Sequence, residues 1–440
     1  MSMRVAQANL EIVRRIDQHL PMRKAPAFEA AVNFSGSYRQ PVHRWFRYRE
    51  GFSPSMMELI REGDRVYDPF CGCGTALVEA ARQRIQAVGT DVNPLAVFVA
   101  KTKSADYSED NLRAFETLAA LALTEDWGRG EAPQMPLLPK LFLPAALDEL
   151  LRIRAIVDTA DGQVHDLLKL AWLSILEGCS NAFKEGNGLK YRSMRRAPGK
   201  YVEIPAHIWI DRHFGSDIRS FVRGKWGSAT RAISEDLKVR PVHWRSPRVI
   251  EGSCLDGNTV AEVGEVDTAI FSPPYANRFD YFEAFKVELW MGGFVKEPKE
   301  LAGLRKRSMR NNLTVRGGTD YVVPELEHLL ELMDPESTSV RMGIKQTLRG
   351  YFEDVHNLAQ NLRACLRPGG RSICVVGNSA YAGVLIPTDA ICAMIFGKAG
   401  LSVETVDVAR HLTVSPQQRR LMPADLLAGM RESVVICTRQ

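Results

Sequence analysis

Two acidic residues flank a glycine-containing loop in the first quarter of the sequence. Residues 68–75 are Asp-Pro-Phe-Cys-Gly-Cys-Gly-Thr, and Asp91 follows shortly after them. Gly72 and Gly74 allow the backbone to approach a ligand closely, because neither carries a side chain. The N–H groups at the start of a following helix favour a carboxylate or a phosphate, and an acid at a strand end can accept hydrogen bonds from ribose hydroxyls. The pattern therefore predicts a nucleoside-binding site.

The glycine loop lacks a motif of dinucleotide-binding proteins, and this absence restricts the kind of nucleoside that we expect to bind. The Gly-x-Gly-x-x-Gly pattern of dinucleotide-binding proteins is absent, since residue 77 is Leu. We therefore expect a nucleoside with an amino-acid tail rather than NAD. A Gly-x-Gly alone is also typical of a tight strand-to-helix turn, but Asp68, Phe70 and Asp91 around it favour a ligand site.

A second motif, Phe271-Ser272-Pro273-Pro274-Tyr275, follows another predicted strand. Two successive prolines have fixed φ angles and no N–H donors, so their carbonyls can only accept hydrogen bonds. Ser272 Oγ and the carbonyl of Pro273 could accept the hydrogens of an exocyclic amino group, while the ring of Tyr275 stacks on the base. The alternative is a Pro-rich turn with a packed tyrosine. Because both motifs follow strands, we expect them at one sheet edge.

Seven segments rich in β-branched residues predict buried strands, and helical segments lie between several of them. Strands that alternate with helices indicate a doubly wound, mostly parallel α/β sheet. The predicted strands are 65–68, 86–91, 248–251, 266–271, 371–376, 403–408 and 433–438. The predicted helices include 76–84, 95–102, 112–123, 144–158, 165–183 and 351–366.

The alternation is interrupted between the second and third predicted strands. We interpret residues 105–247 as an inserted helical and basic domain, with residues 1–104 and 248–440 as the two parts of the main domain. Residues 184–248 hold fifteen Lys or Arg and six acids, although the whole chain of 440 residues has a formal charge of only +5. A local cationic excess of this kind indicates a polyanionic partner.

A second interruption, residues 296–349, carries a further basic cluster. Lysine and arginine side chains bind nucleic-acid phosphates, and arginine also binds guanine edges. The alternatives are a solvated charged face, and a small core for the aromatic residues of the insertion. The candidate nucleic-acid-binding residues are Lys190, Arg192, Arg195, Arg196, Arg305, Lys306, Arg307 and Arg310.

Composition excludes several other classes. No apolar run is long enough for a membrane span, and the charged N-terminal residues are unlike a signal peptide. Eight Cys in a chain of this length are too few for a disulfide scaffold, and neither Cys nor His shows the spacing of a metal site. We therefore expect a cytoplasmic enzyme without a metal.

The glycine loop and the Ser-Pro-Pro-Tyr motif together resemble the amino-specific DNA methyltransferases that use S-adenosylmethionine. This resemblance implies a Rossmann-like seven-strand sheet, in which residues 41–65 also belong to the cofactor-binding region. The Ser-Pro-Pro-Tyr form implies the cytosine N4 type, with Ser272, Pro273, Pro274 and Tyr275 as the catalytic motif. It further implies cofactor-binding roles for Asp68, Phe70, Gly72, Gly74, Thr75, Asp91 and Asp256, the last toward the adenine amino group.

We therefore expect methylation of a flipped cytosine in double-stranded DNA, by an enzyme that is associated with the nucleoid through this DNA. The expected role is host modification or restriction–modification, and a cognate restriction endonuclease is a further candidate partner. Carbon-5 methylation is disfavoured because no Pro-Cys dipeptide occurs. The alternatives are an adenine-N6 or RNA methyltransferase on the same fold and a non-catalytic nucleic-acid-binding protein.

Overall fold

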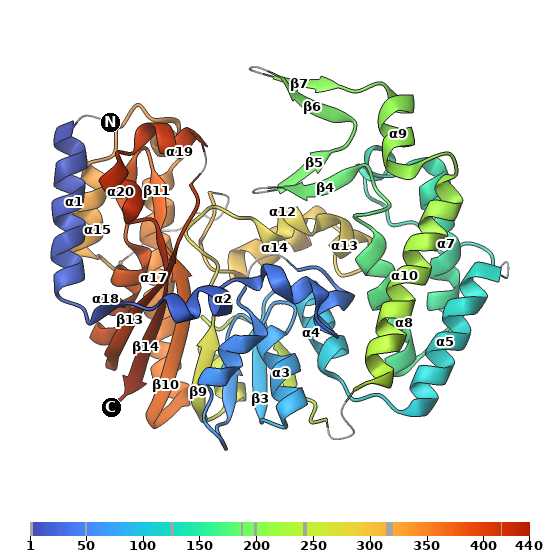
Figure 1. The fold of residues 1–440 in the computed structure, drawn as a ribbon, viewed down its shortest axis with the longest axis horizontal. Coiled ribbons are helices and arrows are strands. Elements are labelled where there is room, and N and C mark those ends of the chain that lie inside the picture. The colour runs from blue at the N-terminus through green and yellow to red at the C-terminus, as the bar shows by residue number, and fades with distance from the viewer. Residues whose placement is uncertain are drawn as a thin grey trace.

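The computed structural model describes residues 3–48, 51–124, 127–185, 188–197, 200–240, 244–313, 320–414 and 416–440. Within them, one eight-stranded sheet runs in the order β1-β13-β14-β10-β9-β2-β3-β8 (Figure 1). In that order, the strands are Met22–Lys24, Leu401–His411, Arg431–Arg439, Leu366–Gly377, Val266–Phe271, Val66–Asp68, Ala87–Asp91 and Arg248–Glu251.

The sheet is parallel except at β14, which is antiparallel to both neighbours. All seven predicted strands are present, and the doubly wound α/β class is confirmed. The expected number of strands was too small, because β1 adds an eighth strand beside β13. Its three residues, Met-Arg-Lys, have no buried apolar face and are held by backbone pairing and by the Arg23–Asp407 ion pair, so hydrophobic periodicity could not reveal them.

Both faces of the sheet are covered. Alternate residues of β9 belong to different cores, with Ile270 on one side and Ala269 and Phe271 on the other, as the two-residue period of a strand requires. The Ile270 side packs against α3 (Thr75–Gln83) and a 3₁₀ segment, Pro54–Leu59. The opposite side packs against α11 (Gly257–Val263), α17 (Ile344–Cys365) and α18 (Thr388–Lys398).

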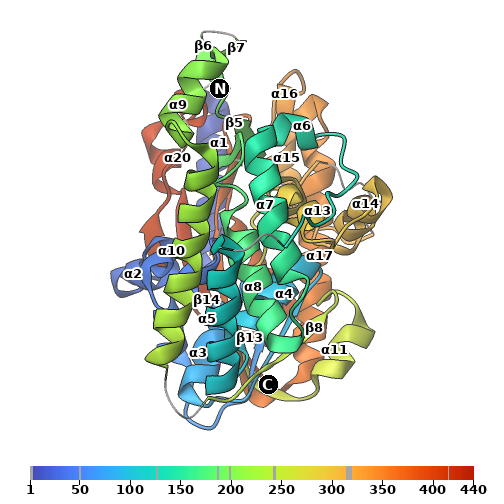
Figure 2. The same cartoon turned by 90° about the vertical axis from the view of Figure 1, so that its right-hand side faces the viewer.

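Between α4 (Pro94–Ser104) and β8 the chain forms a helical bundle with two β-hairpins. Figure 2 shows the long helices of the bundle side by side, and Trp226 at its centre donates a hydrogen bond to the carbonyl of Ala119. The helices are α5 (Glu109–Thr124), α6 (Leu138–Leu141), α7 (Pro144–Val157), α8 (Gly162–Ile175), α9 (Ala206–Phe214) and α10 (Ile218–Lys238). The hairpins pair β4 (Ala182–Glu185) with β5 (Gly188–Tyr191) and β6 (Met194–Ala197) with β7 (Lys200–Glu203).

These hairpins add four short strands to the insertion that was expected to be helical and basic. Their strands are four residues long, each contains Lys or Arg, and three of the four have no fully buried residue, so no apolar alternation marks them. The predicted helix 165–183 ends earlier, at Ile175, and β4 follows it. Both hairpins project from the bundle on the side of the sheet where α12 (Tyr281–Ala284) lies (Figure 1).

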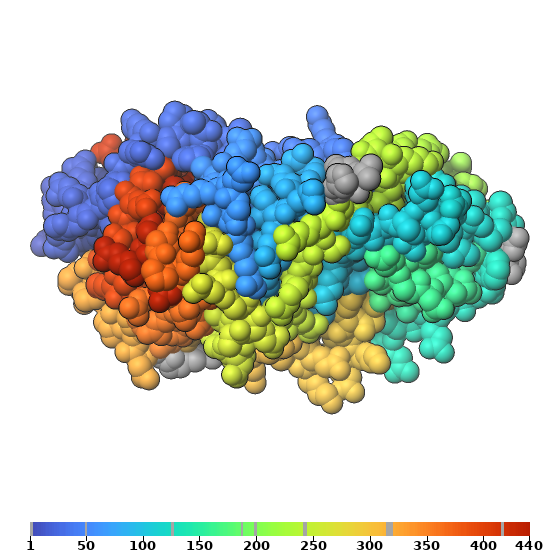
Figure 3. Space-filling view, turned by 90° about the horizontal axis from the view of Figure 1, so that it is seen from below, coloured from blue at the N-terminus to red at the C-terminus, as the bar shows by residue number. Residues whose placement is uncertain are grey.

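The remaining helices lie around the sheet. In Figure 3, seen from below, the insertion and the C-terminal strands occupy opposite ends of the molecule. No described helix is long and apolar enough to cross a membrane. The remaining helices are α1 (Met3–Gln18), α2 (Glu29–Val32), α13 (Lys286–Met291), α14 (Pro298–Arg307), α15 (Pro324–Glu331), α16 (Thr338–Arg341), α19 (Pro416–Leu421) and α20 (Ala424–Ala428). Two short strands, β11 (Ser379–Tyr381) and β12 (Val384–Ile386), pair with each other outside the large sheet.

Candidate active site

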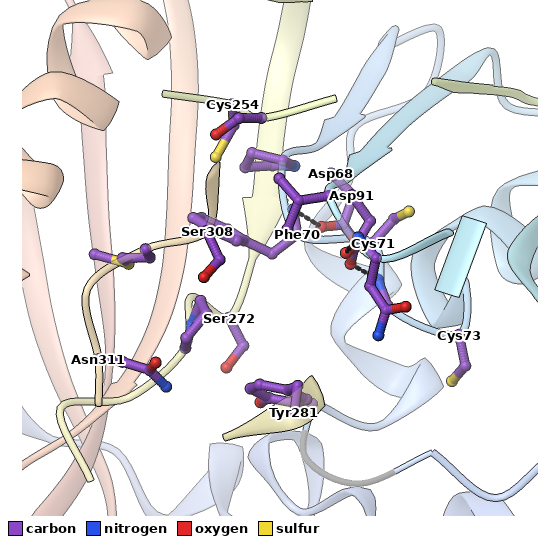
Figure 4. Close-up of a pocket in the computed structure, with 18 of the residues that line it drawn as sticks. Asp68, Phe70, Cys71, Cys73, Asp91, Cys254, Ser272, Tyr281, Ser308 and Asn311 are labelled. Atoms are coloured by element: carbon purple, nitrogen blue, oxygen red, sulfur yellow. Dashed lines mark hydrogen bonds between the residues drawn. The ribbon is translucent and has the colours of Figure 1, made fainter. Parts of the chain in front are cut away.

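A cavity of about 980 Å³, including space open to solvent, lies at the carboxyl ends of four neighbouring strands. Residues that follow β2, β3, β8 and β9 line it, which is where doubly wound sheets bind ligands. Both sequence motifs therefore meet at one edge, as expected: Asp68 and Asp91 lie on one side and Ser272 on the other (Figure 4).

The glycine loop is held open by left-handed backbone at two positions. Gly72 has φ +49° and Gly74 has φ +81°, a region that residues with a Cβ adopt only at a cost. A Cβ on Gly74 would lie 3.0 Å from Ala100 of α4, so close packing also requires glycine there. Gly72 lines the cavity, whereas Gly74 precedes α3 and shapes the turn. Phe70 and Thr75 line the cavity beside them.

Asp91 fixes the loop and the next turn at once. Its carboxylate accepts hydrogen bonds from Gly72 N at 3.0 Å and from Asn93 N at 2.8 Å. Burial raises the pKa of Asp91 to about 6, although these two N–H groups oppose the shift. Asp68 accepts a hydrogen bond from Phe70 N at 3.0 Å.

The two buried carboxylates make the cavity receptive to a cation. Burial, with the nearby Asp91 charge, raises the pKa of Asp68 to about 8, against the hydrogen bond from Phe70. A buried carboxylate with such a pKa lacks a compensating positive charge, and no ion pair to Asp68 or Asp91 occurs in the part of the chain that the structure describes. A ligand with a positively charged group near Asp68 would supply that charge.

The Ser-Pro-Pro-Tyr motif begins directly after β9. Ser272 and Pro274 line the cavity, whereas Pro273 is buried behind them. Tyr275 is outside the cavity lining: its hydroxyl donates a hydrogen bond to Glu432 at 2.8 Å, and its ring lies against Gly377. The tyrosine is thus anchored on β14 and β10, beside the motif.

Three further segments that the motifs did not specify complete the walls. Tyr48 lies in the region 41–65 that the family resemblance pointed to, and its ring stacks on Tyr281 at 6.0 Å. Asn93, after β3, is also part of the wall. Residues 308–312 contribute Ser308, Met309, Asn311 and Asn312 from the second interruption (Figure 4). The sequence identifies only the cations of this segment as candidate functional residues, because isolated Ser and Asn residues form no motif that predicts a ligand site.

Asp256 is not part of the cavity. Its carboxylate caps α11 by accepting hydrogen bonds from Asn258 N and Thr259 Oγ1, both at 3.2 Å, and Ser253, Cys254 and Leu255 face the cavity instead. We therefore do not retain the expected contact between Asp256 and an adenine amino group. Asp256 follows β8, as expected, but it lies five positions beyond the end of that strand, and its side chain caps α11.

The candidate nucleic-acid-binding cations fall into two groups. Arg305 binds Asp280 at 2.9 Å, and Arg310 binds Glu353 and Asp354 at 2.6 and 2.5 Å. Arg192 donates hydrogen bonds to the carbonyls of Ser180 and Glu177. These three arginines hold the protein together, and we withdraw the nucleic-acid role for them.

The other five candidates remain accessible. Arg195 and Arg196 are exposed on β6 and make no ion pair within the described residues, and Lys306 and Arg307 are exposed at the end of α14. Lys190 is partly exposed and donates a hydrogen bond to Tyr201 of β7. Several other cations of the insertion are paired internally, among them Lys184, Arg219, Arg223, Lys238 and Arg240. The hairpins therefore carry exposed cations, and exposed cations without an ion pair in the described residues also lie on α9 and α10, at Arg212, Lys225 and Arg231.

Comparisons with known proteins agree with this site. Residues 53–127, which contain the glycine loop and Asp91, match a family model described as an RMKL-like methyltransferase domain. The Type II methyltransferase M.AvaI of Nostoc is 23% identical, over 85% of this chain and 82% of its own length. M.BsoBI of Geobacillus stearothermophilus is 26% identical, over 83% and 79%.

A third relative, the Type II methyltransferase M.MvaI of Kocuria varians, is 21% identical over 88% of this chain and 89% of its own length. These matches extend through the insertion as well as the sheet. These matches agree with the predicted resemblance, and the chain is similar to Type II methyltransferases over most of its length.

Proposed function

We propose that the protein transfers a methyl group from S-adenosylmethionine to the exocyclic N4 amino group of a cytosine in double-stranded DNA. The observation that carries this proposal is the shared cavity, in which Asp68 and Asp91 face Ser272. The names of the relatives support a site-specific enzyme of a restriction–modification system. A cognate endonuclease remains a prediction.

The donor set fits S-adenosylmethionine. The buried carboxyl of Asp68, with a pKa of about 8, suits the positively charged amino-acid part, and Asp91 has the acceptor oxygens for ribose hydroxyls. Gly72 leaves room on the loop for close approach, and Phe70 and Tyr48 supply apolar walls. When bound, this cofactor supplies a methyl group on an already activated sulfonium.

Because the methyl group is activated, the protein needs no covalent nucleophile, and positioning supplies the catalysis. The lone pair of a cytosine N4 is delocalised into its ring. Acceptors at Ser272 Oγ and the Pro273 carbonyl draw the amino hydrogens out of the ring plane and favour the tetrahedral nitrogen of the transition state. The nitrogen loses one proton after the methyl group has bonded to it.

The target atom is inaccessible inside a duplex, so the base must be extruded into the site. The predicted stacking role of Tyr275 would require its ring to move from Gly377 into the cavity, because the ring now lies outside the lining and its hydroxyl donates a hydrogen bond to Glu432. The β6–β7 hairpin, with Arg195 and Arg196, is a two-stranded ribbon of the kind that enters a major groove. Lys190, Lys306 and Arg307 add cations on other surfaces around the site.

Mass spectrometry of nucleosides tests this proposal. DNA and RNA are incubated separately with the protein and isotope-labelled S-adenosylmethionine and then digested. We expect labelled N4-methylcytosine from the DNA. Labelled N6-methyladenine would overturn the base assignment and keep the rest. Label in RNA alone would overturn the substrate, and no label in either would favour a non-catalytic binding protein. A Ser272→Ala variant is the control for contaminating activity.

A further inference from the structure

One residue of the loop after the Ser-Pro-Pro-Tyr motif has an unfavourable backbone conformation. Arg278 has φ +68°, in the left-handed region, which is unfavourable for a residue with a Cβ. Such strain persists only where the surrounding structure imposes it, and it concentrates at functional sites. Arg278 is three residues beyond Tyr275, on the segment that joins two walls of the cavity.

Hydrogen bonds and an ion pair hold the chain on both sides of Arg278. The Ala276 carbonyl accepts a hydrogen bond from Tyr381 Oη at 2.5 Å, and the Phe279 carbonyl accepts one from Asn311 Nδ2 at 2.8 Å. Phe279 N donates to Asn277 Oδ1 at 3.0 Å. The next residue, Asp280, is bound by Arg305. These contacts impose the turn, so the position of Arg278 is preset.

The guanidinium of Arg278 is not used by the protein itself. Arg278 is partly exposed, and within the described residues it makes no hydrogen bond or ion pair. The neighbouring acids are engaged: Asp280 with Arg305, and Glu283 with Lys286 and Arg305. Arg278 is also absent from the cavity lining, whereas Pro274 before it and Tyr281 after it belong to that lining. Its guanidinium is therefore available to bind a group that lies outside the cofactor cavity.

We propose that Arg278 binds a DNA phosphate next to the extruded nucleotide and so positions the target strand. This inference rests on the proposed function. A base that enters the site between Ser272 and Tyr281 would bring its own backbone near the loop between Pro274 and Tyr281, on which Arg278 lies. A guanidinium binds phosphate oxygens with two parallel hydrogen bonds, and a preset backbone reduces the ordering cost of that contact. Arg278 is thus a positioning residue, distinct from the hairpin cations.

Three variants separate charge from strain. Arg278→Gly removes the charge and relieves the backbone, Arg278→Gln removes the charge and keeps the strain, and Arg278→Lys keeps both. Arg84→Gly is the matched control, because Arg84 also has a left-handed backbone, φ +62°, but ends α3, away from the cavity. Affinity for a short labelled duplex around a site that the wild-type protein methylates is measured at several salt concentrations. Calorimetry gives S-adenosylmethionine affinity, and thermal unfolding gives stability.

We expect the Gly and Gln variants to bind the duplex about tenfold more weakly, as for loss of a hydrogen bond to a charged group. The slope of log affinity against log salt should become shallower by about 0.9, the value for one phosphate contact. Arg278→Lys should retain most of the wild-type slope, and Arg84→Gly all of it. Cofactor affinity should not change, and Arg278→Gly should unfold no earlier than wild type.

Unchanged salt slopes for the Gly and Gln variants, in a protein that methylates DNA, would overturn this inference alone. A loss confined to Arg278→Gln would also overturn it, because strain rather than charge would then be responsible. If the wild-type protein neither binds nor methylates DNA, the proposed function fails as well. The wild-type reaction therefore distinguishes the two failures.

Discussion

Replacement of Asp68 by Asn should stabilise the ligand-free protein, by an amount that grows with pH. Burial raises the pKa of Asp68 to about 8, whereas an Asp in an unfolded chain has a pKa of about 3.9. Between these values the folded protein keeps a proton that the unfolded chain releases. The contribution of this group to stability is complete below about pH 4 and is lost as pH rises through about 8.

The magnitude follows from linkage. One proton difference changes the free energy of unfolding by about 1.4 kcal/mol per pH unit. From pH 5 to pH 7, both inside the window, the stability gap between Asp68→Asn and wild type should widen by up to about 3 kcal/mol. Asn keeps an Oδ1 acceptor for Phe70 N, so the local turn is preserved.

Urea unfolding of ligand-free wild type and variant at both pH values measures this gap, and the titrations of other groups largely cancel in the difference. Asp217→Asn is a control whose stability gap should stay constant between pH 5 and 7, because hydrogen bonds from Ser220 lower the pKa of Asp217 and the group is ionised in both states throughout this range. Calorimetry should show S-adenosylmethionine binding to Asp68→Asn weakened by about tenfold or more, from loss of a charged hydrogen-bond acceptor. A gap that stays constant between pH 5 and 7 would refute the buried-carboxylate reasoning, and unchanged cofactor affinity would refute the role of Asp68 in binding.

Three further predictions address the other parts of the site. Asp91→Ala should weaken S-adenosylmethionine binding by about tenfold or more, because ribose hydrogen bonds to a carboxylate are lost; equal affinities by calorimetry would contradict the assignment. Ser272→Ala should slow methyl transfer about tenfold or more in single-turnover assays, as expected for an acceptor that acts in the transition state, while cofactor affinity stays constant; a wild-type rate would exclude Ser272 from the chemistry. Reversal of Arg195 and Arg196 to Glu should weaken DNA binding and make its salt slope shallower by about 1.8, as for two phosphate contacts. Arg113→Glu, on the distal helix α5, is the control, and an unchanged slope for the double variant would move DNA binding away from the hairpin.

Local chemistry made much of this protein predictable from its sequence. β-branched runs predicted seven of the eight strands of the sheet, because a strand that is covered on both faces, such as β9, is apolar along most of its length. The glycine loop, Asp91 and Ser272 could be assigned to one edge, since the ends of parallel strands meet there. Each of these inferences uses residues within a few positions of one another.

The tertiary structure decided which of several chemically similar side chains are exposed and which are paired within the protein. Arg195 and Arg305 look alike in the sequence, but only the fold brings Arg305 to Asp280 and leaves Arg195 exposed on a hairpin. The wall formed by Ser308 and Asn311, and the turn that removes Asp256 from the cavity, likewise depend on how distant segments pack. Sequence patterns report local conformation and burial, whereas charge pairing and cavity walls arise from contacts between segments whose separation along the chain carries no periodic signal.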